Sequence, residues 1–273
     1  MDLDLRKLRY FAAVAELGHF GRAAGHLYIA QPVLSRQIRA LERELGCALL
    51  ERTTRSVQLT PAGRQLRTDV PGLLGNADAV TRRTLEVARG VQRLVIGFAP
   101  GLRVSELVRA FADARPEVDV EPTMLTWFDQ AAALHDGRAD VGLLRRPFDD
   151  DGLTTVSVGS EAQVVVLPAD HRLAARRQIR KSDLAGETVM NASARRTSSV
   201  EEKFELIASD RGVACLPRSV ARYYARPDLV HRPVRDAERY QICLAVPATR
   251  RQRHVREFLT IAERVLAGSP PAR

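Results

Sequence analysis

Residues 20–63 read FGRAAGHLYIAQPVLSRQIRALERELGCALLERTTRSVQLTPAG, and this stretch decides the fold of the N-terminal part of the chain. Its longest helical pattern spans Gln31–Leu45, with Pro32 in the first turn and Gly46 at the C-terminal stop. The apolar residues recur at intervals of three and four, which predicts a helix with a single buried side. They are Leu34, Ile38, Leu41 and Leu45.

The opposite face of this predicted helix is polar and cationic. Arginine can fork onto a guanine edge or grip a phosphate, and serine can donate or accept a hydrogen bond. A helix with such a face on a small core is typical of one that enters the DNA major groove. The alternative for each single arginine is a solvated surface charge. The candidate DNA-contacting residues are Gln31, Pro32, Ser35, Arg36 and Arg39.

Two shorter helices are predicted before this one. Phe20–Leu27 carries the small residues Ala23 and Ala24, which allow the close, steep packing of a helix-turn-helix. Leu5–Leu17 completes a three-helix core, with an inward stripe predicted at every third or fourth residue. The stripe consists of Leu5, Leu8, Phe11, Ala12 and Ala15.

A two-stranded wing is predicted after Gly46, where the sequence continues LLERTTRSVQLT. Apolar residues flank a charged tip that contains Arg52 and Arg55. We expect these arginines to lie on the sugar-phosphate backbone or in the minor groove. The predicted head is therefore an all-α winged helix-turn-helix over residues 1–60.

Three segments together resemble the LysR-type transcriptional regulators: LRYFAAVAELGHFGRAA, QPVLSRQIRALERELGCALLER and VQLTPAGRQL. The resemblance is dense over about the first 65 residues and looser afterwards. It implies a cytoplasmic bacterial regulator that binds double-stranded DNA, with a long dimerising helix and a two-lobed ligand-sensing domain. It also implies a homodimer or a homotetramer.

The basic residues are concentrated at the two ends of the chain. Residues 1–90 hold 14 Lys and Arg against 9 Asp and Glu, residues 91–247 hold 22 of each, and residues 248–273 hold 6 against 2. The net charges are thus +5, zero and +4, which sum to the +9 of the whole chain. A basic head on a neutral sensing body fits this distribution.

Composition and motifs exclude several other classes of protein. No apolar run reaches the roughly 18 residues of a membrane span, and the charged start MDLDLRKLRYF lacks a signal-peptide core. We therefore expect a cytoplasmic protein with no membrane partner. Cys47, Cys215 and Cys243 have no metal-ligand spacing, and no catalytic or nucleotide-binding motif is present. We predict no enzyme activity, no metal site and no cofactor.

A linker helix is predicted over residues 61–90, capped by Thr60 and starting at Pro61. Its apolar positions alternate at intervals of four and three, which is a heptad seam and favours pairing with a second chain. Pro71 removes one backbone hydrogen bond, so we expect a kink unless the seam holds the helix straight. The seam is Leu66, Val70, Leu73, Ala77, Val80, Thr84 and Val87.

Residues 91–273 alternate between strand and helix patterns, which predicts an α/β body with a mostly parallel sheet. We expect two periplasmic-binding-protein-like lobes, 91–160 with 246–273 and 161–245, joined by crossovers near Gly159–Gln163 and near Val246. Few residues separate the predicted strand Thr188–Met190 from the next helix. The second lobe therefore looks trimmed by about one αβ unit relative to the family.

A small, polar or anionic effector is expected between the lobes, at the carboxyl ends of the strands. A turn and a helix start near Gly101 and Ser105 favour an anion, Trp127 is a candidate wall, and an arginine after the third strand is a candidate carboxylate clamp. The alternatives are that Trp127 belongs to the hydrophobic core and that Arg145 and Arg146 are exposed surface charges. The candidate effector residues are Gly101, Ser105, Trp127, Arg145, Arg146, Asn191, Thr197 and Ser198.

Three further functions remain open at this point. The first is a small-molecule binding protein with an accessory DNA-binding head, and the second is a DNA-binding regulator that needs no ligand. The third is an enzyme with an accessory helix-turn-helix. The missing signal-peptide core and the basic head argue against the first, and the missing catalytic motifs argue against the third.

Overall fold

The computed structural model describes residues 3–52, 57–190, 199–250 and 252–268. The chain divides into two compact units, Met1–Leu85 with His135–Gly137, and Glu86–Leu134 with Arg138–Arg273. Each unit has its own hydrophobic clusters and is described separately. No helix among the described residues combines the length and the apolar character that a membrane span requires.

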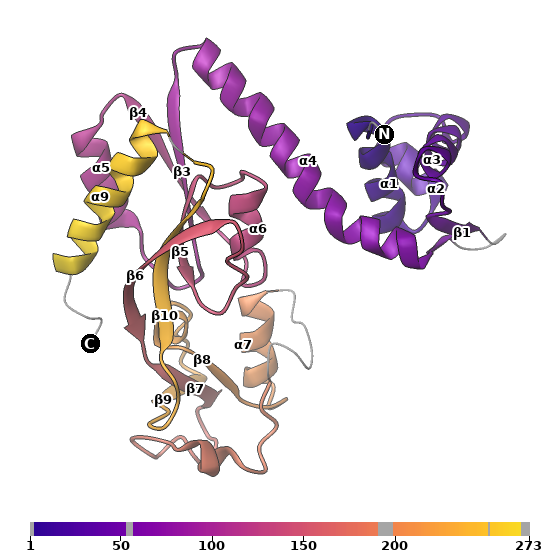
Figure 1. The fold of residues 1–273 in the computed structure, drawn as a ribbon. Coiled ribbons are helices and arrows are strands. Elements are labelled where there is room, and N and C mark those ends of the chain that lie inside the picture. The colour runs from indigo at the N-terminus through magenta and orange to yellow at the C-terminus, as the bar shows by residue number, and fades with distance from the viewer. Residues whose placement is uncertain (1–2, 53–56, 191–198, 251, 269–273) are drawn as a thin grey trace. The chain divides into compact units, whose positions relative to one another are not determined.

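The first unit begins with three helices, a wing and a long helix (Figure 1). The sequence predicted the first and third of these helices with their observed ends, and the second to within one residue. The elements are α1 (Leu5–Leu17), α2 (Phe20–His26), α3 (Gln31–Leu45), β1 (Leu50–Arg52), β2 (Val57–Leu59) and α4 (Pro61–Ala88). The antiparallel pairing of β1 with β2 confirms the predicted wing.

The helices of the head end where their caps predict. Asp4 accepts hydrogen bonds from the backbone of Arg6 and Lys7 at the start of α1. Gly18 and Gly46 follow α1 and α3 in the left-handed conformation, with φ of 63° and 70°. Only glycine adopts this conformation at little cost, so both helices stop there.

The head core contains fully buried residues from all three helices, including Phe11, Leu34 and Ile38. The predicted inward stripe of α1 was partly wrong. Leu5 is exposed, whereas Ala13 and Val14 are buried. The reason is that α1 packs against both α2 and α3, so its buried surface is broader than one stripe and is rotated toward Val14.

The joint between the wing and α4 explains the sequence Thr60-Pro61-Ala62-Gly63. The Thr60 hydroxyl accepts from the Gly63 backbone N–H at 3.0 Å and donates to the Ala48 carbonyl at 2.8 Å, which confirms the predicted cap. A Cβ at Gly63 would lie 2.0 Å from the Leu49 carbonyl oxygen. The helix approaches the wing so closely that only glycine fits.

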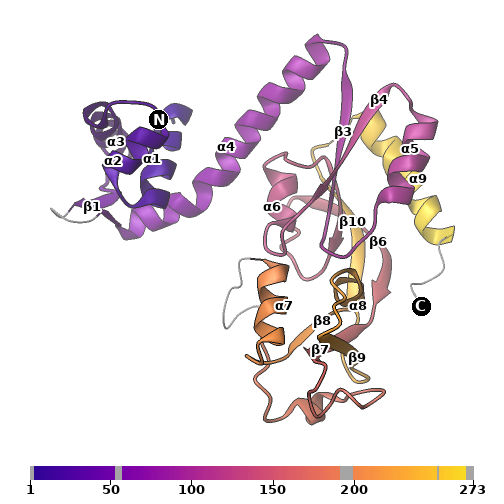
Figure 2. The same ribbon diagram turned by 180° about the vertical axis from the view of Figure 1, so that it is seen from behind.

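The long helix α4 continues past Pro71 without ending. Its ribbon bends between the turns nearest the head and the longer remainder (Figures 1 and 2). The heptad positions of α4 also differ in burial on the two sides of this bend. Val70 is 1% exposed and joins the head core, whereas Leu73 and Val80 are 43% and 53% exposed. The prediction that the whole seam faces a partner was therefore wrong for Val70.

In the described part of the second unit, the larger sheet has the strand order β4-β3-β5-β10-β6. Strand β3 runs parallel to β4 and β5, but β10 runs antiparallel to β5 and β6, so the sheet is mixed and not mostly parallel as predicted. The strands are β3 (Gln92–Phe98), β4 (Val118–Met124), β5 (Val141–Arg145), β6 (Leu153–Glu161) and β10 (Tyr240–Pro247).

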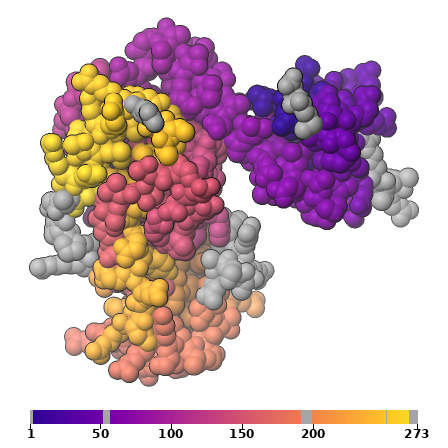
Figure 3. All heavy atoms as spheres, viewed as in Figure 1, coloured from indigo at the N-terminus to yellow at the C-terminus, as the bar shows by residue number. Residues whose placement is uncertain are grey.

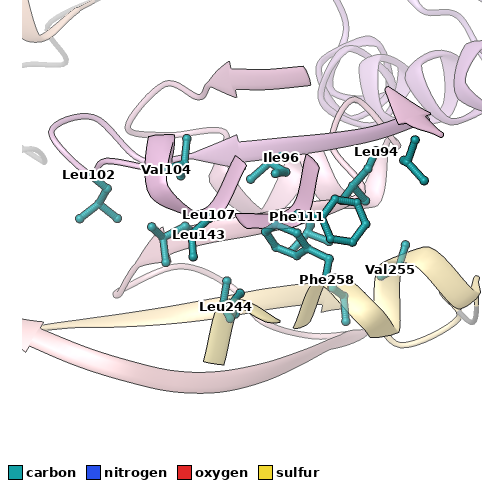
Figure 4. Packing of buried hydrophobic residues seen from close by; sticks show 14 of the residues in the cluster. Leu94, Ile96, Leu102, Val104, Leu107, Phe111, Leu143, Leu244, Val255 and Phe258 are labelled. Carbon is teal, nitrogen blue, oxygen red and sulfur yellow. The ribbon is translucent and has the colours of Figure 1, made fainter. Parts of the chain in front are cut away.

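Helices cover both faces of this sheet. On one face, α5 (Ser105–Ala114) and α9 (Arg253–Gly268) meet where the rings of Phe111 and Phe258 lie 5.4 Å apart, edge to face (Figure 4). On the other face, α6 (Gln130–His135) packs on the alternate strand residues. Helix α6 begins only after a turn in which the Asp129 carboxylate accepts from the Thr126 backbone N–H at 2.7 Å.

The described sheet of the smaller lobe has three strands, in the order β8-β7-β9, with β7 antiparallel to both neighbours. This supports the prediction of a trimmed second lobe. The expected strand Thr188–Met190 is reduced to one bridge between Val189 and Val213. The elements are β7 (Gln163–Pro168), η1 (Lys181–Leu184), α7 (Val200–Ala208), β8 (Ala214–Pro217), α8 (Arg218–Tyr223) and β9 (Leu229–Pro233).

The chain passes between the two sheets at two places. The first is at Ala162, between β6 and β7, as predicted. The second was predicted near Val246, and this was wrong. Strand β10 already pairs with β5 and β6 from Tyr240 onward, so the chain returns to the larger sheet before that residue.

Candidate nucleic-acid interface and effector cleft

Helix α3 presents the predicted face to solvent. Arg36 and Arg39 are exposed, while Leu34, Ile38 and Leu41 on the opposite side are buried. Because the buried side fixes the rotation of the helix, the two guanidinium groups point away from the head core. The structure also places Gln31 and Pro32 on the exposed surface at the start of α3 and Ser35 half-buried beside them.

One exposed residue of the helix-turn-helix, Tyr28, was missed by the sequence reasoning. Tyr28, in the turn before α3, is 96% exposed and has a φ of 54°, which is unusual for a bulky residue. His19 caps α2 by accepting from the Gly21 backbone N–H at 3.0 Å, so it is structural.

The wing tip is less fully described. Arg52 closes β1, and its backbone pairs with Val57. The side chain of Arg52 and the whole of Arg55 lie outside the described residues. Their predicted contact with DNA therefore stays a prediction.

A cleft with a volume of about 160 Å³ lies between the two lobes of the second unit. Its walls come from the loop after β3, the end of β4 and the loop that follows, helix α7 and the residues flanking α8. Most of the lining is apolar or aromatic. The lining residues are Pro100, Met124, Leu125, Thr126, Trp127, Phe128, Ser199, Val200, Glu201, Lys203, Leu216 and Tyr224.

Three ionisable groups line this cleft. Burial, helped by a hydrogen bond with Glu201, raises the pKa of Tyr224 to about 12. Burial also lowers the pKa of Lys203, and no ion pair holds its ammonium group within the described part of the chain. Lys203 is thus a partly desolvated cation beside an apolar wall, and an anionic group would complement it.

Arg145 does not line this cleft, and its guanidinium group is already bonded to other groups of the protein. Its Nε donates to Glu161 Oε1 at 2.7 Å, Nη1 to the Pro100 carbonyl at 3.1 Å and Nη2 to Ser219 Oγ at 2.8 Å. The side chains of Arg145 and Glu161 are only 2% and 9% exposed. Burial lowers the pKa of Arg145, and the Glu161 carboxylate opposes that shift.

This buried pair ties the lobes together. Arg145 ends β5 and Glu161 ends β6 in the larger lobe, while Ser219 belongs to α8 of the smaller one. Ser219 also donates its backbone N–H to Glu161 Oε2 at 2.8 Å. The Arg145 guanidinium carbon lies 5.6 Å from the centre of the Trp127 ring, which lines the cleft. The cluster therefore joins the cleft wall to the junction of the lobes.

Among the described members of the predicted effector set, Trp127 alone lines the cleft. Arg146 pairs with Asp150 at 2.6 Å, which raises its pKa, and Ser105 is exposed at the start of α5. Gly101 has a φ of 80° and lies so close to α8 that a Cβ would be 2.7 Å from the Val220 nitrogen. Asn191, Thr197 and Ser198 lie outside the described residues.

Lys203 and Tyr224 were not among the predicted residues. Ser199 caps α7 by accepting from the Glu202 backbone N–H at 3.1 Å, and it also lines the cleft. To predict that Lys203 lines the cleft, one must know which face of helix α7 meets the loop after β4. The sequence pattern of the helix does not give that. A lysine on an otherwise apolar helix face is the signal that the sequence offered.

The fold thus defines a winged helix-turn-helix protein with a two-lobed α/β domain. Residues 5–64 match the model of the bacterial regulatory helix-turn-helix proteins of the lysR family, and residues 88–196 and 191–267 match that of the LysR substrate binding domain. The chain therefore belongs to the LysR family of bacterial regulators.

Relatives and solved structures agree with this assignment. The chain is 40% identical over 192 residues to the uncharacterized HTH-type transcriptional regulator YnfL of Escherichia coli, covering 68% of this chain and 65% of YnfL. It is 37% identical to the Hca operon transcriptional activator HcaR of the same organism, over 67% of this chain and 63% of HcaR. The matched segments span less than two thirds of either relative.

Full-length BenM has a similar structure, with a TM-score of 0.54 and 26% identity over 99% of this chain and 100% of BenM. CbnR in complex with its target DNA shows the same fold, with a TM-score of 0.63 and 24% identity over 96% of this chain and 99% of CbnR. The likeness extends over both units of the chain.

Proposed function

We propose that the protein is a sequence-specific DNA-binding transcriptional regulator whose activity a small molecule controls from the cleft between the lobes. The exposed Arg36 and Arg39 on a helix fixed by a buried face are the observation that supports DNA binding. The protein acts in the cytoplasm, where its DNA lies, as a regulator and not as an enzyme.

The functions that we propose for the three segments are those expected from the sequence. Residues 1–60 bind DNA through Gln31, Pro32, Ser35, Arg36 and Arg39, with Arg52 and Arg55 at the wing. Residues 61–90 pair two chains, and residues 91–273 sense the effector. Strand β10 belongs with the first lobe, because it pairs with β5 and β6.

Replacing Arg36 or Arg39 with alanine should weaken binding to the operator. The loss of a bidentate contact to a base costs about 1–3 kcal/mol and relaxes specificity at one position in each half-site. Fluorescence anisotropy with operator DNA and with scrambled DNA measures both effects. Arg109→Ala on α5 is the control, because it removes an exposed arginine from the other unit. Wild-type affinity in both head variants would contradict the assignment.

The proposed effector has an apolar, flat body and one anionic group. Trp127, Phe128 and Leu216 offer apolar surface, and Lys203 offers the cation. The cleft also suits the small anion expected from the sequence, but Lys203 takes the role assigned there to Arg145, which is held by Glu161.

Replacing Lys203 with methionine should weaken effector binding by about tenfold or more, because a hydrogen bond to a charged group is worth about 1.5–3 kcal/mol. The measurement is a thermal-shift screen of aromatic monocarboxylates, each beside its neutral amide. The wild type should prefer the acid and the variant should not. Lys181→Met, on the 3₁₀ turn η1, is the matched control.

An unchanged preference for acids in Lys203→Met would place the anion elsewhere in the cleft. If no compound of the screen binds the wild type, the effector class is wrong. In both cases the DNA-binding proposal stands, because it depends on α3.

A further inference from the structure

The smaller lobe carries a second concave site, which shares no residue with the cleft. This arginine basin has a volume of about 470 Å³ and lies where α8, β9 and the loop after β7 meet. Figure 2 shows α8 and β9 side by side in this lobe. The basin residues are Ala175, Arg176, Arg177, Arg218, Arg222, His231, Arg232 and Pro233.

The charge of the arginine basin is one-sided. Five arginines and a histidine line it, and no carboxylate is among its described lining residues, although Asp183 beside it pairs with Arg176. Residues 91–247 are neutral in sum, with 22 basic and 22 acidic residues, so the cations have been gathered locally. Like charges held in one concavity repel, and a bound polyanion would offset that repulsion.

The side chains of Arg232 and Arg176 are held in place before any ligand binds, and the backbone of Arg218 is fixed as well. Arg232 donates Nε to the Ala174 carbonyl and Nη1 to the His231 carbonyl, both at 2.9 Å. Arg176 is fixed by Asp183 at 2.5 Å. Arg218 begins α8 half-buried, and its backbone N–H donates to the Ala162 carbonyl at 3.0 Å. Ordered arginines lose less side-chain entropy when they bind an anion.

The pKa of His231 reflects its burial and the positive charge of the arginines around it. Burial lowers its pKa, and Arg232, Arg218 and Arg222 lower it further. A neutral imidazole inside an arginine cluster can still donate one hydrogen bond, and it gains a proton more easily once an anion sits beside it.

Guanidinium groups match phosphate oxygens two at a time, and the size and charge of the basin exceed what one phosphate satisfies. We propose that the arginine basin binds a small anion with two adjacent phosphate groups, either inorganic pyrophosphate or the diphosphate of a nucleotide.

Binding there would reach the rest of the domain through α8. This helix carries Arg218 and Arg222 on the basin, and between them Ser219, which is bonded to Arg145 and Glu161 at the lobe junction. Tyr224, directly after α8, lines the cleft. A diphosphate that shifts α8 would therefore move both the lobe junction and Tyr224 in the cleft wall, so the two ligands would be coupled.

The test is isothermal titration of the full-length protein with pyrophosphate and, separately, with ADP at matched ionic strength. Arg218→Gln/Arg222→Gln should bind at least about tenfold more weakly for each arginine lost. Arg103→Gln/Arg109→Gln removes the same charge from exposed positions at and before α5 and should bind like the wild type. Tighter binding of ADP identifies the nucleotide as the source, and equal binding identifies the free diphosphate.

The DNA-binding head is also basic, so Arg36→Ala/Arg39→Ala serves as a second control and should retain diphosphate binding. The pKa of His231, followed by proton NMR and assigned with His231→Gln, should rise when pyrophosphate is added. The proposal is overturned if the wild type binds neither compound. It is equally overturned if both charge-matched pairs weaken binding alike, or if only the head variant loses it.

Discussion

Arg145→Met should lower the free energy of unfolding of the two-lobed domain by about 3–5 kcal/mol, because it leaves the Glu161 carboxylate buried without its cation. Glu161 would keep only its hydrogen bonds with Ser219. The protein has a single tryptophan, Trp127, which lies 5.6 Å from the Arg145 guanidinium carbon. Its fluorescence during urea unfolding therefore reports on this domain and not on the head.

Two further variants separate loss of the ion pair from general disruption. Arg146→Met removes the neighbouring arginine, whose bond to Asp150 is exposed, and should change the stability by about 1 kcal/mol or less. Arg145→Met/Glu161→Leu removes both charges and should recover much of the lost stability, since a buried pair replaced by apolar groups is often neutral. A double variant as unstable as Arg145→Met would show that the hydrogen bonds to Pro100 and Ser219 matter more than the charge.

The role of Arg145 also shows where sequence reasoning stopped. Its position at the end of a strand was predicted, but its partners Glu161 and Ser219 lie 16 and 74 residues away in the chain. A pattern of residue types predicts an element and its buried side, whereas the partner of a charged side chain depends on how distant elements assemble. Because those partners could not be identified from the sequence, Arg145 was predicted to bind the carboxylate of an effector.

The head was predicted more closely because its signals are local. Gly46 ends α3, Thr60 caps α4, and the spacing of Leu34, Ile38 and Leu41 fixes which side of α3 is buried. The larger sheet depended on distant pairing instead. Strand β6 was missed, and the antiparallel insertion of β10 between β5 and β6 follows from the return of the chain from the smaller lobe.

Helix α4 combines both kinds of information. Its heptad pattern was evident in the sequence, but the structure assigns Val70 to the head core and leaves Leu73, Val80 and Val87 exposed. An apolar stripe left in water along a helix is unfavourable, and burying it against a second copy relieves that cost. The proposed dimer therefore depends on the part of the seam after Pro71.

Leu73→Glu/Val80→Glu should convert the proposed dimer into a monomer and weaken operator binding by about 10²–10⁴-fold. Two glutamates from each chain would face each other across the paired helices, where like charges and lost apolar contact both oppose association. When one head is bound, the dimer presents the second head to the other half-site at high effective concentration, and a monomer loses that advantage. Light scattering measures the mass, and anisotropy with operator DNA measures the affinity.

Leu85→Glu is the matched control for this prediction. Leu85 is 49% exposed, close to the 43% of Leu73, and lies on the same helix, but it is not a seam position. The single variants Leu73→Glu and Leu85→Glu make the same chemical change at similarly exposed positions, so a dimer that survives Leu85→Glu and is weakened by Leu73→Glu depends on the heptad register and not on the net charge of α4. If the seam variant remains a dimer with wild-type affinity, the chains associate through another surface. If Leu85→Glu is equally disruptive, the interface covers a wider face of α4 than the heptad pattern indicates.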